Sequence, residues 1–305
     1  MTTILDLPVE EYMLPGNRSC AGCGLGIGLR YILKALDGKC IMVVPASCLT
    51  VLGGMYPVSS VRVPWINSVF PGTAAVASGV SIGLKALNKE NDYTVLAMAG
   101  DGGTVDIGIQ GLSGASERNQ NFLYICYDNE AYMNTGTQRS GATPRGVKTT
   151  TTPLEGKRHN PKDMPKIMEA HNIPYVATAC VAYPIDLYDK VKKAKDIKGL
   201  RYIHLLVPCP SGWQYDPKDT VNIGQLAVET GAFILYEVEN GELRLTGRSR
   251  RIAMGGKLKS IDEYLNLQNR FLKFTPEEIE EYQKEINQRW EILVKRDKSL
   301  QKEEN

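Results

Sequence analysis

Hydrophobic residues occur in short, strand-sized runs that alternate with longer segments of helical spacing. Runs rich in β-branched and aromatic residues indicate strands that are covered on both faces. Such runs occupy residues 40–44, 93–99, 122–127, 175–179 and 202–207. Helical spacing is found over residues 24–36, 73–87, 106–118, 161–171 and 185–195, and residues 139–161 indicate a long loop. This alternation predicts an α/β fold, a doubly wound and mostly parallel sheet.

The chain changes to a charged tail after Gly241, so we expect an α/β domain over residues 1–245 and a C-terminal extension over residues 246–305. Within the extension, residues 275–278 combine a capping box with proline at the first helical position. They predict a helix that runs to about Lys298. Its apolar residues form one stripe, which fits docking on its own domain and clasping a partner subunit equally well.

Charge and terminal sequence exclude several classes of function. The 36 basic residues nearly balance the 34 acidic ones, the net charge is +2, and no basic block is present, which argues against a nucleic-acid partner. Residues 1–11 include Asp6, Glu10 and Glu11 and lack the pattern of an export signal. The longest apolar runs are only strand-sized. We therefore expect a cytoplasmic protein without a membrane span.

Seven cysteines, an odd number, make a disulfide framework improbable and favour metal or redox roles for some of them. Cys20 and Cys23 form a C-x-x-C pair, while Cys48 and Cys209 lie in loop-like sequence. If these four thiols meet, structural zinc and a 4Fe–4S cluster fit equally well, because both take four thiolates. The other cysteines lie in apolar contexts that indicate packing: Cys40, Cys126 and Cys180.

The pattern most indicative of chemistry is Gly100-Asp101-Gly102-Gly103, at the end of the strand predicted over 93–99. Asn129 follows the next predicted strand, so both should lie at the carboxyl edge of the sheet, where α/β sheets bind ligands. Magnesium prefers oxygen ligands, which Asp101, Asn129 and a diphosphate would supply. The glycines allow close approach of phosphates, and Thr104 with the following helix offers amide donors.

Three stretches, residues 100–108, 127–136 and 139–144, resemble the β subunit of archaeal- and bacterial-type pyruvate:ferredoxin oxidoreductases. The resemblance covers roughly residues 12–240 and implies a thiamine-diphosphate-binding fold. It implies that Asp101, Asn129 and the carbonyl of Ala131 hold Mg²⁺. It also implies that Asn134 lies beside the substrate. The remaining cofactor-binding residues that it implies are Ser47, Gly100, Gly102, Gly103 and Thr104.

The cysteine segments are similar to the proximal cluster site of the same family. This similarity implies that Cys20, Cys23, Cys48 and Cys209 bind a 4Fe–4S cluster. The family activity is oxidative decarboxylation of pyruvate to acetyl-CoA and CO₂, with one-electron transfers to ferredoxin. It implies an α subunit that supplies a catalytic carboxylate, ferredoxin-like γ and δ subunits, and coenzyme A as a substrate.

Several alternatives stay open from the residues alone. The substrate can be another 2-oxoacid, such as a branched-chain oxoacid or oxalate. The protein can also be a non-redox thiamine-dependent decarboxylase or synthase with structural zinc, or a non-catalytic zinc-stabilised scaffold. Gly24-x-Gly26-x-Gly28 follows a cysteine pair, not a strand, so a dinucleotide loop is not expected. Arg30 fits a surface role as well as neutralisation of cluster or substrate charge. The three histidines are assigned to the surface or the core.

Overall fold

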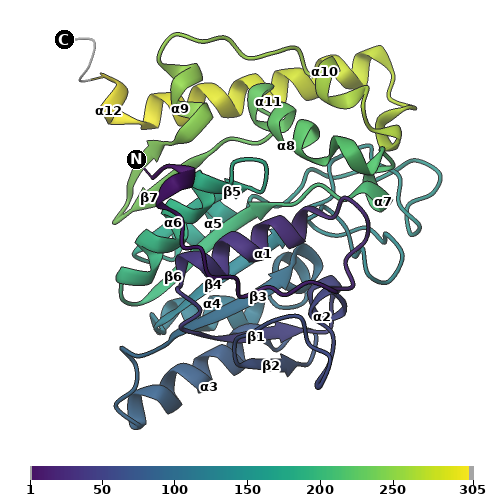
Figure 1. Cartoon of the computed structure of the whole chain (residues 1–305). Helices are drawn as coiled ribbons and strands as arrows, with labels where there is room; N and C mark the ends of the chain where they lie inside the picture. The colour runs from purple at the N-terminus through teal and green to yellow at the C-terminus, as the bar shows by residue number, and fades with distance from the viewer. Residues whose placement is uncertain (1, 302–305) are drawn as a thin grey trace.

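An eight-stranded sheet runs through the computed structural model, which describes residues 2–301 (Figure 1). The strand order is β2-β1-β3-β4-β6-β5-β7-β8. The first six strands in this order are parallel, and β7 and β8 are antiparallel to their neighbours. The strands are β1 (Cys40–Pro45), β2 (Trp65–Ser68), β3 (Thr94–Gly100), β4 (Phe122–Asp128), β5 (Tyr175–Cys180), β6 (Leu200–Leu206), β7 (Tyr236–Glu239) and β8 (Glu242–Leu245). All five strands expected from the sequence are present, and the predicted fold class is confirmed.

Helices cover both faces of the sheet, as a doubly wound fold requires. One face is covered by α1 (Gly24–Ala35) and α6 (Pro184–Asp196), and the other by α3 (Thr73–Ala86), α4 (Ile109–Glu117) and α5 (Met164–Ala170). Successive side chains of β3 point to opposite faces of the sheet, Leu96 and Met98 to the α1 side and Ala97 and Ala99 to the α3 side. The remaining helices are α2 (Cys48–Gly53), α7 (Pro210–Trp213), α8 (Thr220–Glu229), α9 (Gly247–Ala253), α10 (Asp262–Leu265), α11 (Pro276–Arg296) and α12 (Lys298–Gln301).

The structure differs from the sequence prediction at several elements. The helix expected over 106–118 begins at Ile109 and is preceded by a π-helical turn over Gly102–Asp106. The helix expected from residue 161 begins at Met164, because the Asp163 side chain accepts a hydrogen bond from the Lys166 amide and caps it there. Strands β2, β7 and β8 and helix α8 were not expected.

The C-terminal helix α11 follows the predicted capping box and runs across the top of the view in Figure 1. Its side chains Ile286 and Leu293 are buried against the chain's own α/β core. The apolar stripe therefore docks on its own chain, which is one of the two alternatives that the sequence left open. The boundary at residue 245 stays a prediction. Within residues 2–301, no helix combines the length and apolar character needed to cross a membrane.

Candidate functional site

The predicted site residues gather at the carboxyl edge of the parallel strands. Asp101 directly follows β3 and Asn129 directly follows β4, and these strands pair with Gly100 opposite Tyr127. Cys48 begins α2 after β1, and Cys209 precedes α7 after β6. Both short helices lie at the right-hand end of the sheet in Figure 1. The two constellations expected from the sequence therefore share one edge of one sheet.

Three oxygen atoms converge at the predicted magnesium site. The side-chain oxygen position of Asn129 lies 3.1 Å from Asp101 Oδ1 and 2.9 Å from the carbonyl oxygen of Ala131. Oxygens of these kinds cannot donate hydrogen bonds to one another, so either the amide is turned to present its nitrogen or a cation lies among them. Neighbouring ligands of an octahedral Mg²⁺, bound at about 2.0–2.1 Å, stand about 2.8–3.0 Å apart. The spacing and the donor set fit magnesium.

Asp101 is fully enclosed, with 1% of its surface exposed. Burial, followed by the negative charge of Asp128, raises the pKa of the Asp101 carboxyl well above its usual value. Ser140 Oγ opposes this shift by donating a hydrogen bond of 2.5 Å to Asp101 Oδ2. A divalent cation at this position would hold the carboxylate in its charged form.

The long loop over residues 139–161 is anchored against this site. Lys157 Nζ donates to the carbonyl oxygens of Gly141, at 2.8 Å, and Thr143, at 2.6 Å. Burial, followed by the positive charge of Arg139, lowers the pKa of Lys157 to about 8. Lys157 thereby fixes the backbone on either side of Ala142, next to the serine that contacts Asp101. The sequence predicted the long loop but gave no role to Ser140 or Lys157.

The glycine-rich turn fits a backbone cradle for phosphate. The π-helical turn starts immediately after Asp101, and a Cβ atom on Gly102 would lie 2.7 Å from the ring of Tyr132, so a side chain is excluded there. Thr104 Oγ1 donates to the Gly100 carbonyl at 2.8 Å and is fully buried. Ser47 Oγ likewise donates to the Pro45 carbonyl at 2.8 Å. These two hydroxyls are engaged within the protein, and a ligand role for either residue stays a prediction.

Asn134, the residue expected beside the substrate, is exposed in the loop that follows Ala131. The loop is closed by an isolated bridge between Tyr132 and Gln138. The catalytic role of Asn134 stays a prediction. Arg30 binds Glu11 through two hydrogen bonds, at 2.8 and 2.5 Å, which favours the surface role.

The four cysteines expected to bind a cluster are free thiols within electrostatic range of one another. The pKa of Cys48 is raised to about 12 by burial and then by the neighbouring thiols of Cys209, Cys23 and Cys20. Among the described residues, no group of three or more His, Cys, Asp or Glu side chains is arranged to hold a single metal ion. A 4Fe–4S cluster is itself several ångströms wide, so its thiolates stand farther apart than those around one ion.

Backbone amides point at two of these sulfurs. Cys23 precedes α1, and its thiol pKa is raised by burial and lowered by hydrogen bonds from the amides of Leu25 and Gly26. Cys209 precedes α7 and receives equivalent bonds from Gly212 and Ser211. Amide donors stabilise thiolate sulfur and tune iron–sulfur clusters. The donor set therefore fits a cluster as well as a redox thiol.

The cysteines and histidines assigned to packing or surface lie where they were expected. Cys40, Cys126 and Cys180 are buried. His159 is exposed, and His171 is partly buried, with its ring 2.8 Å from Ser113 Oγ. His204 is a core residue whose Nε2 lies 2.8 Å from Asp128 Oδ2. The contact between His204 and Asp128, next to the segment of Asn129 and Ala131, had no signal in the sequence.

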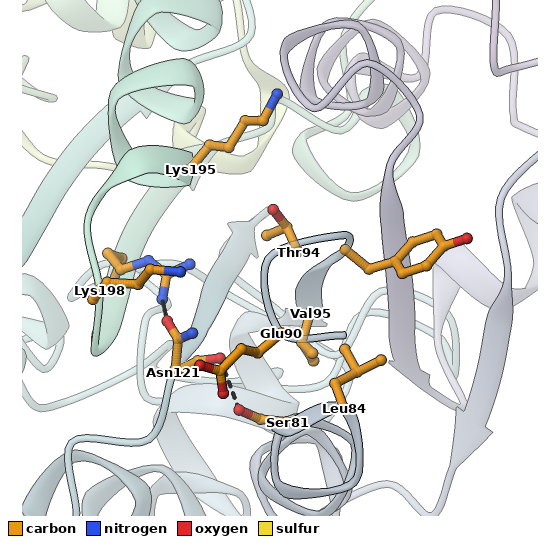
Figure 2. A pocket seen from close by; sticks show the side chains of 10 residues that line it. Ser81, Leu84, Glu90, Thr94, Val95, Asn121, Lys195 and Lys198 are labelled. Atoms are coloured by element: carbon orange, nitrogen blue, oxygen red, sulfur yellow. Dashed lines mark hydrogen bonds between the residues drawn. The ribbon is translucent and has the colours of Figure 1, made fainter. Parts of the chain in front are cut away.

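Two cavities bear on where ligands can enter. A pocket of about 30 Å³ lies at the opposite, amino-terminal edge of the sheet, where Figure 2 shows Thr94, Asn121 and Lys198 around it. It is too small for an organic cofactor, since one water occupies about 30 Å³ of liquid. A cavity of about 440 Å³ lies between the long loop and α11, and Asp128 and His204 contribute to its wall. The larger cavity therefore adjoins the segment that follows β4, since Asp128 and Glu130 contribute to its wall.

Comparison with known proteins agrees with this geometry. Residues 46–205 match the family model of the C-terminal TPP-binding domain of thiamine pyrophosphate enzymes. The chain is 50% identical over 285 residues to pyruvate synthase subunit PorB of Methanothermobacter thermautotrophicus, with 91% of this chain and 96% of that protein covered. This chain belongs to the 2-oxoacid:ferredoxin oxidoreductase β subunits. Ketoisovalerate oxidoreductase subunit VorB of Pyrococcus abyssi is 46% identical to this oxidoreductase subunit over 300 residues, covering 95% of each.

A solved structure gives the same fold. The 2-oxoglutarate:ferredoxin oxidoreductase from Magnetococcus marinus, with 2-oxoglutarate, coenzyme A and succinyl-CoA bound, superposes on this oxidoreductase subunit with a TM-score of 0.58. The match covers 70% of this chain and 79% of that one at 22% identity. The predicted family and enzyme class are confirmed, and the subunit carries a thiamine-diphosphate-binding domain and works with partner subunits. The non-catalytic scaffold and the non-redox enzyme are disfavoured by this membership.

Proposed function

We propose that this subunit holds thiamine diphosphate through Mg²⁺ in a complex that oxidises pyruvate to acetyl-CoA and CO₂. The observation that carries the proposal is the convergence of the Asp101 carboxylate, the Asn129 side-chain amide and the Ala131 carbonyl at the carboxyl edge of the sheet, beside the glycine turn. Pyruvate is the first candidate because the PorB relative is 50% identical over nearly the whole chain. A branched-chain oxoacid is the second candidate, since the VorB relative is 46% identical.

Each residue of the site has a separate task in this proposal. Asp101, Asn129 and the Ala131 carbonyl hold the metal, and Ser140 fixes the second carboxylate oxygen of Asp101. The backbone amides of Gly102 and the next residues would bind the diphosphate. When bound, thiamine diphosphate supplies the electron sink that decarboxylation of a 2-oxoacid requires. Asn134, on its exposed loop, would contact the substrate.

The four cysteines hold a 4Fe–4S cluster in the same proposal. Oxidation of one 2-oxoacid to its acyl-CoA and CO₂ releases two electrons and one proton. A cluster held by these cysteines would supply one-electron chemistry, so the two electrons would leave for ferredoxin in separate transfers. The amide donors at Cys23 and Cys209 support a cluster at this position, because such bonds stabilise thiolate ligands.

The complete site requires other chains. An α subunit would supply the carboxylate that activates the aminopyrimidine ring, and ferredoxin-like γ and δ subunits would carry electrons onward. Within the described residues there is one sheet. In this proposal its carboxyl edge would carry only the diphosphate half of the site. We place the complex in the cytoplasm.

The test is to co-express the chain with its partner subunits under anaerobic conditions. Reduction of a viologen dye is measured with coenzyme A and either pyruvate or ketoisovalerate. We expect the complex to require both coenzyme A and a 2-oxoacid, and to give a higher kcat/KM with pyruvate than with ketoisovalerate. Absence of 2-oxoacid-dependent reduction by the intact complex would refute the proposal. A higher kcat/KM with ketoisovalerate would refute pyruvate as the substrate and assign the branched-chain oxoacid instead. Full turnover by the isolated chain would refute the division of the site between subunits.

A further inference from the structure

A buried ion pair joins the C-terminal extension to the segment Asn129–Ala131, which is called the magnesium loop below. Arg270 Nη1 donates to Glu130 Oε2, from a residue 140 positions later in the chain. The two side chains are 3% and 15% exposed. The other nitrogens of Arg270 are also engaged, Nε with Gln268 Oε1 at 2.9 Å and Nη2 with the Tyr264 hydroxyl at 3.2 Å. Neighbours within the extension therefore orient the guanidinium toward Glu130.

Glu130 stands between the two proposed ligands Asn129 and Ala131, in a conformation that needs support. Its φ is +65°, in the left-handed region that residues with a Cβ atom rarely adopt. Its amide donates to Asp128 Oδ1 at 2.8 Å, and its carbonyl accepts from Thr143 Oγ1 at 2.6 Å. The Arg270 ion pair adds a third anchor, on the side chain. Any change in this residue is transmitted to the ligands on both sides.

The same guanidinium contacts the cysteine side of the site. Its central carbon lies 3.7 Å from the ring centroid of Trp213, a fully buried side chain. Trp213 Nε1 donates to the Asn129 carbonyl at 2.8 Å. The Trp213 amide donates to the Cys209 carbonyl at 2.9 Å. One arginine thus contacts both the carboxylate of the magnesium loop and the indole that links this loop to the segment of Cys209.

We propose that Arg270 is a positioning residue that holds the Asn129–Ala131 segment in its metal-binding geometry and ties it to the Cys209 segment. This inference rests on the proposed function, since it presumes that the segment holds magnesium. It gives the C-terminal extension a role in the site, because Gln268 and Tyr264 orient the guanidinium. A planar fork stacked on an aromatic ring suits this role, and lysine lacks both the fork and the stacking surface.

The experiment measures the Mg²⁺ dependence of thiamine-diphosphate binding by the anaerobic complex. Arg270→Met and Glu130→Gln should each weaken the apparent Mg²⁺ affinity 10- to 100-fold, as loss of residues that orient metal ligands does. Arg270→Lys should fall between these variants and the wild type. Glu281→Gln is the matched control, since it breaks the ion pair between α11 and Arg145 of the long loop without touching the ligands. It should bind Mg²⁺ as the wild type does.

The double variant Glu130→Gln/Arg270→Met separates positioning from charge burial. It contains no uncompensated charge, yet it should bind Mg²⁺ as weakly as Arg270→Met does. The reason is that the magnesium loop and Trp213 have both lost their contact with the guanidinium. Recovery of wild-type Mg²⁺ affinity by the double variant would overturn the inference, and so would unchanged affinity in Arg270→Lys and Arg270→Met. If the wild-type complex bound thiamine diphosphate without Mg²⁺, the proposed function would fail instead. The EPR signal of the reduced cluster should also change in Arg270→Met and remain as wild type in Glu281→Gln.

Discussion

Replacing Ser140 with alanine removes one hydrogen bond from the proposed magnesium ligand and leaves every proposed ligand atom in place. Ser140 is fully buried, and its Oγ donates to Asp101 Oδ2 at 2.5 Å. A buried hydrogen bond to a charged group contributes about 1.5–3 kcal/mol. Since about 1.4 kcal/mol corresponds to a tenfold change, Mg²⁺ and thiamine diphosphate should bind about 10- to 100-fold more weakly.

The pH dependence of Ser140→Ala gives a second readout. The Ser140 hydrogen bond opposes the upward shift of the Asp101 pKa, so its loss raises that pKa further. Protons should then compete better with the metal, and the affinity deficit should grow as the pH falls. Titration of the anaerobic complex with Mg²⁺ at saturating thiamine diphosphate, at two pH values, measures both effects.

Ser116→Ala is the matched control for this experiment. Ser116 is equally enclosed, at 3% exposure, and its hydroxyl donates to a carbonyl within α4, away from the site. It should leave the Mg²⁺ affinity unchanged. If Ser140→Ala bound Mg²⁺ as tightly as Ser116→Ala, the Asp101 carboxylate would not be a metal ligand held by this hydrogen bond.

Three further outcomes are expected. Cys209→Ser should lower the iron content and abolish electron transfer to viologen. The core variant Cys126→Ser should keep its iron, and equal iron in both variants would refute Cys209 as a cluster ligand. Asn129→Ala should weaken retention of thiamine diphosphate less than Asp101→Ala, since a neutral ligand contributes less than a carboxylate; the reverse order would contradict the ligand assignment. The pKa of Lys157 is lowered to about 8, so the unfolded chain binds more protons than the folded chain between pH 8 and about 10.5. The free energy of unfolding should therefore rise over that range by about 2–3 kcal/mol relative to Lys157→Met, and parallel stability profiles of the two proteins would disprove it.

The fold, and the position of the candidate ligand residues at the carboxyl edge of the sheet, were accessible from the sequence because their signals are local. The apolar runs gave the central parallel strands, and the Gly-Asp-Gly turn with Asn129 gave the converging strand ends. The missed elements have weaker signals. Strand β2 is four residues long and partly exposed, and it lacks the apolar run of a buried strand. The β7–β8 hairpin did carry a signal, the Asn240-Gly241 pair, and both residues have positive φ, at 49° and 85°.

The supporting residues of the site could not be predicted, because they depend on contacts distant in sequence. Ser140 reaches Asp101 across 39 positions, and Arg270 reaches Glu130 across 140. Nothing in the segments around these residues specifies the partner. Their roles follow only from the folded arrangement of the long loop and the C-terminal extension around the carboxyl edge.

Cofactor content of the anaerobically purified complex tests the central claim most directly. Thiamine diphosphate, magnesium, iron and acid-labile sulfide are counted for each copy of this chain, in the wild type and in Asp101→Ala. The account predicts iron and sulfide in both proteins, with thiamine diphosphate and magnesium present only in the wild type. Zinc in place of iron, or retention of thiamine diphosphate by Asp101→Ala at the wild-type level, would contradict it.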